Sequence, residues 1–160
     1  MRGNMAGQIL QLIYDRFYDD GGVWPTLGYL QRALNRQSAN RIDAARIVQR
    51  VPAALLKPLP SANGYPAPTE RLVLTAEGIE RCIGSGEDIE NFIAAIKWLV
   101  KMAERADLSD DQGEHGLRFT NRQLAEAVSL SSGSDQNAVH RLVAILQSEG
   151  WVRSYSDTSG

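Results

Sequence analysis

The sequence has few of the side chains on which catalysis, metal binding and disulfide bonds depend. Its 160 residues include one cysteine and two histidines, so an intrachain disulfide is excluded. His115 and His140 lack the regular ligand spacing of a metal site. Cys82 has no base near it in the sequence and is expected to be a buried structural thiol. We therefore expect no catalytic residues, no metal, no cofactor and a protein that is not an enzyme.

The sequence also lacks a long apolar run. The N-terminus does not resemble a signal peptide, and the most apolar segment, residues 92–103, is interrupted by Lys97 and Lys101, which argues against a membrane span. Hydrophobic residues make up 43% of the chain and charged residues 22%, values typical of a soluble globular protein. Together with the single cysteine, these features predict a cytoplasmic protein with no membrane partner.

Charge is nearly balanced over the whole chain but unevenly spread along it. The net charge is −2. Residues 30–59 contain six basic residues and one acidic residue, a local charge of +5, whereas residues 76–115 contain four basic and ten acidic residues, a local charge of −6. Such an asymmetry can create a patch of one sign on a nearly neutral protein.

The first half of the chain predicts four helices and a strand. Apolar residues at helical spacing, a capping threonine at Thr26 and another at Thr75 mark their positions. Pro52 ends the third helix because its ring cannot continue the backbone hydrogen bonds. In chain order, the expected elements are helices at 8–19, 26–34 and 43–51, a strand at 70–75 and a short helix at 76–82.

The second half predicts three helices and a final strand. Acidic residues at Asp88 and Glu90 suit the first turn of a long helix, Thr120 and Gln123 fit a capping box, and Gly150 ends the last helix. In chain order, the expected elements are helices at 88–106, 121–128 and 136–149 and a strand at 151–156.

The two halves follow one plan. Residues 24–34, WPTLGYLQRAL, align without gaps with residues 118–128, RFTNRQLAEAV, and each segment follows a helix and a short extended piece. The identities are few, and the repeated order of elements is the stronger argument. We expect a boundary near the glycines at 84–86, which gives units at 1–84 and 85–160.

This order of helix, short strand, helix, turn, helix and hairpin resembles the winged helix-turn-helix fold. Residues 71–82, RLVLTAEGIERC, are similar to the leucine-threonine-x-x-glycine segment that follows the wing in many bacterial winged-helix regulators. Residues 122–152, RQLAEAVSLSSGSDQNAVHRLVAILQSEGWV, are similar to the helix-turn-helix of such regulators. The resemblance implies a mainly α-helical chain with small β-hairpins, built as two winged-helix-like units joined by a long helix. It identifies no specific subfamily.

The second wing is incomplete, because the chain reaches residue 160 where the wing tip would turn. We expect a fragment of a longer protein or a naturally truncated unit, completed by a protein partner or by further domains of the same chain. A strand edge without its partner is also open to pairing in a homodimer.

The resemblance implies double-stranded DNA as a partner and regulation of transcription as a role. In the second unit, the start of the last helix would face base edges in the major groove, where Gln and Asn pair with adenine and Arg with guanine. In the first unit, Pro52 shortens the recognition helix, so its arginines are expected at phosphates. The candidate DNA-binding residues are Arg36, Arg41, Arg46, Arg50, Gln136, Asn137, His140 and Arg141.

The alternative is a protein-protein interaction adaptor or the sensing module of a multidomain effector. Residues 121–153 carry equal numbers of acidic and basic side chains, whereas a domain that reads DNA is more often basic. Asp135 would also lie close to phosphates and oppose binding. For the second unit, contact with DNA and contact with protein both stay open.

Overall fold

The computed structural model describes residues 4–37, 42–62, 64–106, 119–128 and 136–153. Helices hold 63% of these residues, and one antiparallel pair of two-residue strands is the only sheet among them. The expectation of a mainly α-helical protein is therefore confirmed. The chain divides into two compact units, unit 1 at Met1–Gly86 and unit 2 at Glu87–Gly160.

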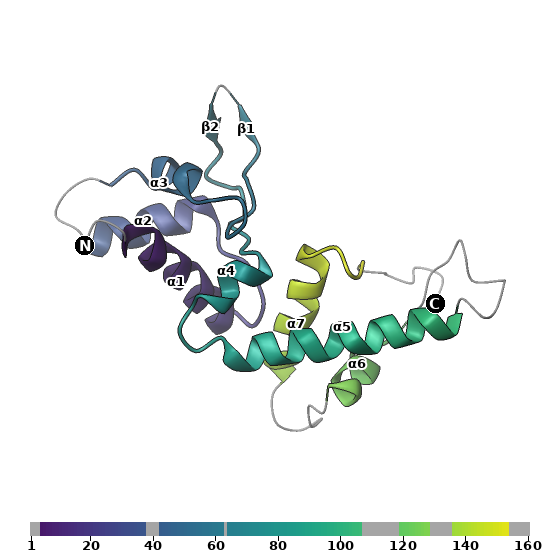
Figure 1. Ribbon diagram of the computed structural model, residues 1–160. Helices are drawn as coiled ribbons and strands as arrows, with labels where there is room; N and C mark the ends of the chain where they lie inside the picture. The colour runs from purple at the N-terminus through teal and green to yellow at the C-terminus, as the bar shows by residue number, and fades with distance from the viewer. Residues whose placement is uncertain (1–3, 38–41, 63, 107–118, 129–135, 154–160) are drawn as a thin grey trace, which may run out of the picture. The chain divides into compact units, whose positions relative to one another are not determined.

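Unit 1 contains four of the helices and the two strands (Figure 1). Helix α1 contacts α2, α3 and α4 and buries Ile9, Ile13 and Phe17 completely. The Phe17 ring stacks on Trp24, with centroids 3.8 Å apart. The elements are α1 (Asn4–Asp19), α2 (Leu27–Gln37), α3 (Ala44–Arg50), β1 (Ser61–Ala62), β2 (Tyr65–Pro66) and α4 (Ala76–Glu80).

The strand expected over residues 70–75 forms only isolated bridges. Thr26 pairs with Arg71, and Leu56 pairs with Leu74, both antiparallel. The amide of Leu72 donates to the carbonyl of Pro25 at 2.8 Å, and the amide of Lys57 donates to the carbonyl of Val73 at 2.9 Å. Three extended segments thus run side by side near residues 25, 56 and 72, although β1 and β2 are the only strands in the part of unit 1 that the structure describes.

The backbone of helix α4 packs directly against the backbone at Leu55. The Thr75 side chain caps the helix by accepting from the amide of Gly78 at 3.0 Å, and the Thr75 amide donates to the carbonyl of Leu55 at 3.1 Å. A Cβ atom on Gly78 would stand 2.1 Å from that same carbonyl oxygen. Glycine at position 78 is therefore what allows α4 to approach this closely.

Unit 2 consists of α5 (Gly86–Ala106), α6 (Asn121–Ala127) and α7 (Gln136–Ser148), with the first residue of α5 at the border of unit 1. Leu124 of α6 and Ile145 and Leu146 of α7 are fully buried. Trp98 of α5 meets Phe119 edge to face, with ring centroids 5.2 Å apart. These contacts make a small helical core.

The predicted caps of unit 2 are confirmed, whereas its final strand is not found in the described residues. Thr120 and Gln123 form a full capping box. Gly150 has a φ of 82°, and the amide of Trp151 reaches back to the carbonyl of Leu146 at 2.9 Å, a pattern that ends helices. Residues 151–153 form no strand. Residues 154–156 lie outside the described residues.

Candidate nucleic-acid interface

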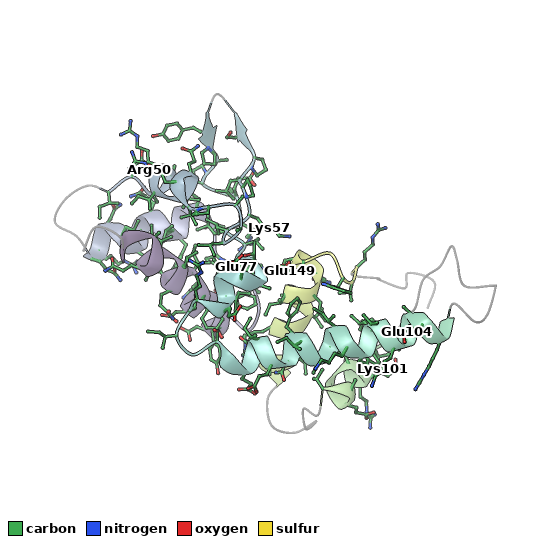
Figure 2. The ribbon with its side chains drawn as sticks, in the orientation of Figure 1. Arg50, Lys57, Glu77, Lys101, Glu104 and Glu149 are labelled. Atoms are coloured by element: carbon green, nitrogen blue, oxygen red, sulfur yellow. The ribbon has the colours of Figure 1, made fainter. Side chains whose placement is uncertain are left out.

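Helix α3 of unit 1 has one buried side and one basic side. Ala44, Ala45 and Val48 are buried, whereas Arg46 and Arg50 are exposed, with Arg50 at the C-terminal end of the helix (Figure 2). Four residues separate the two arginines, so they lie on the same face of the helix. The positions expected from the sequence for these two side chains are therefore open to a ligand.

Two side-chain hydrogen bonds join α3 to the β1–β2 pair. The Tyr65 hydroxyl donates to Asp43 Oδ2 at 2.6 Å, and Gln49 Nε2 donates to the carbonyl oxygen of Gly64 at 2.8 Å. Asp43 also caps α3, because its Oδ1 accepts from the amide of Ala45 at 3.1 Å. The strand pair and α3 therefore present one connected surface, which we call the α3–β surface: Arg46, Gln49, Arg50, Gly64 and Tyr65.

The one acidic residue of the basic stretch is engaged at this surface. The hydrogen bond from Tyr65 lowers the pKa of Asp43, with the Ala45 and Arg46 amides and the Arg46 charge acting in the same direction. The same bond raises the pKa of Tyr65. Asp43 thus stays ionised, with both carboxylate oxygens held by neighbours.

The other arginines of residues 30–59 lie on α2 or outside the described residues. Arg32 and Arg36 lie exposed on α2, and Gln31 of the same helix anchors the start of α3. Its Nε2 donates to the carbonyl of Ile42 at 2.6 Å, and its Oε1 accepts from the amide of Ala44 at 2.9 Å. Arg41 lies outside the described residues.

In unit 2, the start of α7 exposes only part of the expected set. Asn137 and His140 are exposed, whereas the side chain of Gln136 lies outside the described residues. Arg141 is buried, with 1% of its surface exposed. The expectation that Arg141 contacts DNA is therefore wrong, because its guanidinium is buried and paired with Asp88.

Arg141 forms a buried ion pair that the sequence did not reveal. Its Nε lies 3.1 Å from each carboxylate oxygen of Asp88 in the first turn of α5, and only 2% of the Asp88 side chain is exposed. Arg141 continues the buried stripe of Ala138, Ile145 and Leu142 on α7. The position of Arg141 in line with these buried residues was the only feature of the sequence that indicated its burial.

The described residues offer little for catalysis or metal binding. They contain no group of three or more His, Cys, Asp or Glu side chains that could hold a metal ion. Cys82 is buried as expected, and burial, helped by the Asp15 charge, raises its pKa to about 11. No helix in the described part of the chain has the length and apolarity needed to cross a bilayer.

Comparison with known proteins adds no relative. No family model matches the chain, no curated protein matches it, and no solved structure matches it.

Proposed function

We propose that the chain is a non-enzymatic DNA-binding or regulatory module of a larger cytoplasmic bacterial protein, and that the α3–β surface of unit 1 binds the phosphate backbone. The observation that carries the proposal is the pairing of an exposed basic helix with a strand pair bonded to it. In a winged helix, the second helix of the helix-turn-helix enters the groove, and here the wing would lie along the backbone.

The order of elements in unit 1 supports this reading. Helices α1, α2 and α3 are followed by the β1–β2 pair, and the segments that enter and leave this pair meet at Leu56 and Leu74. A third extended segment joins them where Thr26 pairs with Arg71. In the proposed winged helix, these three segments would form the small sheet, and α2 and α3 would form the helix-turn-helix.

The electrostatics of unit 1 favour contacts with the phosphate backbone over contacts that read the bases. Arg46 and Arg50 are exposed, while the nearest acid, Asp43, is held by Tyr65 and by the cap of α3. Helix α3 has only seven residues, which leaves little length for reading several bases. Arginine contacts to phosphates give affinity that depends on salt and not on sequence.

Unit 2 suits the alternative, a protein-interaction adaptor or sensing module. The burial of Arg141 removes the guanine-pairing side chain from the start of α7, where Asn137 and His140 are left exposed. Two neutral or weakly basic side chains make a poor phosphate site. A contact with protein is therefore the second candidate function, and it belongs to this unit.

Fluorescence anisotropy with a labelled random duplex tests the role of unit 1. The wild-type chain should bind at low salt and weaken steeply as the salt concentration rises. The double variant Arg46→Ala/Arg50→Ala removes two phosphate contacts, so the slope of log K against log salt should become shallower by about two. All duplex sequences should lose affinity alike.

A matched control separates this surface from net charge. The variant Arg81→Ala/Arg122→Ala also removes two positive charges, from exposed pairs with Glu77 and Glu126 on α4 and α6. It should keep the wild-type slope. Equal loss in both variants would mean non-specific attraction, and no binding at low salt would leave the adaptor role.

A further inference from the structure

Helix α5 has two apolar stripes, and unit 2 buries one of them. Phe92 and Ala95 are buried, and Asp88 on the same stripe pairs with Arg141 of α7. The second stripe, which we call the α5 seam, is open. Ile93 and Val100 are 47% and 41% exposed, Ala103 is exposed and two isoleucines are half-buried. The seam consists of Ile89, Ile93, Ile96, Val100 and Ala103.

The seam has the spacing of a coiled coil. Its members are separated by steps of four, three, four and three residues, which keep the side chains facing one partner helix. At about 1.5 Å per residue the seam is roughly 21 Å long. Single exposed apolar side chains are ordinary on protein surfaces, but five in this register mark a helix-helix contact.

The charges beside the seam match a reversed copy of the same helix. Glu90 and Lys97 lie beside the N-terminal and C-terminal halves of the seam, and Glu104 follows on the same flank near the end of the helix; all three are exposed, and Glu104 is labelled in Figure 2. The other flank carries the buried Phe92, so the charged flank is the side on which ion pairs can form.

We propose that the α5 seam pairs with the α5 seam of a second copy of this chain, antiparallel and about a two-fold axis. Ile93 of each copy then lies opposite Ile96 of the other, and Ile89 opposite Val100. In this register Glu90 is within about 3 Å, along the helix axis, of Lys97 in the second copy. The surface is self-complementary, as a two-fold interface requires.

Orientation follows from which flanks meet. In an antiparallel pair each flank meets the same flank of the other helix, so Glu90 of each copy faces Lys97 of the other. In a parallel pair the charged flank would meet the flank of Phe92, which is buried within unit 2. The antiparallel pairing is therefore the one that the charges favour. It does not depend on DNA binding.

Sedimentation equilibrium of the full chain tests the pairing. The wild type should dimerise reversibly, and Ile93→Asp/Val100→Asp should be monomeric with an unchanged far-UV circular dichroism spectrum, because carboxylates cannot be buried in the seam. The control Ile83→Asp alters the most exposed large apolar side chain described, 84% exposed and outside the seam, and should dimerise normally. A monomeric wild type, or loss of the dimer in the control, would overturn the proposal.

Charge reversal tests the orientation without touching the seam. Glu90→Lys and Lys97→Glu each place like charges opposite one another at two symmetric sites, so each should weaken dimerisation roughly tenfold. An equal mixture of the two variants restores opposite charges at both sites and should form mixed dimers of nearly wild-type affinity. Mixed dimers no stronger than those of either variant alone would refute the antiparallel pairing.

Discussion

At the scale of the residue, Arg141 shows how a charged side chain can belong to a core. Its guanidinium and the Asp88 carboxylate are both almost completely buried. Each group has therefore lost its contacts with water and interacts with the other group instead. A buried pair is often no better for stability than apolar residues of similar volume, yet removing one partner leaves a buried charge without its counterion. The two kinds of substitution should therefore differ sharply.

We expect Asp88→Ala to lower the free energy of unfolding by about 3–5 kcal/mol. The double variant Asp88→Leu/Arg141→Met should unfold close to the wild type, because no charge is then left in the core. Urea unfolding followed by circular dichroism measures both. The exposed pair of Arg122 with Glu126 provides the control, since Arg122→Ala should have little effect. If Asp88→Ala lowered the free energy of unfolding only slightly, water would have to reach Arg141.

Cys82 gives unit 1 a dependence on alkaline pH. Burial raises the pKa of its thiol to about 11 from an ordinary value of 9.0, so the thiol of the unfolded chain ionises first. The stability that this difference contributes is complete below about pH 9 and is lost as the pH rises towards 11. The wild type should lose free energy of unfolding relative to Cys82→Ala across that range, as urea titrations at each pH would measure. A constant difference would contradict the assignment.

At the scale of the element, α4 depends on a glycine that helix propensity alone would disfavour. Gly78→Ala should destabilise the protein by roughly 1–3 kcal/mol, because the new Cβ overlaps backbone and not a movable side chain. Gly7→Ala in α1 is the matched control, since nothing lies within 4 Å of its position. It should stabilise by about 0.5–1 kcal/mol. Thermal unfolding compares the two, and equal effects would show that α4 can shift.

The elements also show which sequence signals can be trusted. The helices and the caps at Thr75 and Thr120 were predicted, because periodicity and capping are local. Asp43 was predicted as the first residue of the third helix and instead caps it. The strand predicted over residues 70–75 forms only isolated bridges, because its pairing is set by distant partners such as Thr26 and Leu56. In the same way, the exposure of Arg46 follows from the phase of α3, whereas the Tyr65–Asp43 bond spans 22 residues and has no local signature.

At the scale of the whole molecule, the chain divides into two compact units, Met1–Gly86 and Glu87–Gly160. The sequence predicted two winged-helix-like units from the repeated order of elements, and that character stays a prediction. The sequence could not predict which basic residues would be exposed to solvent and which would be buried. Arg50 and Arg141 carry the same charge and both lie on helices, yet one is exposed and the other buried. The difference lies in Asp88, 53 residues before Arg141, and only the packed unit brings the two together.

That separation constrains the order in which a growing chain can fold on the ribosome. The hydrophobic core of unit 1 is complete once residue 82 has emerged, since its buried hydrophobic residues run from Ile9 to Cys82. Helix α5 emerges next, but the partner of Asp88 is made much later, with α7. Domains generally fold as units during synthesis. Unit 1 can thus reach its native state early. The apolar stripe of α5, by contrast, stays exposed until α7 has been synthesised and can pack against it.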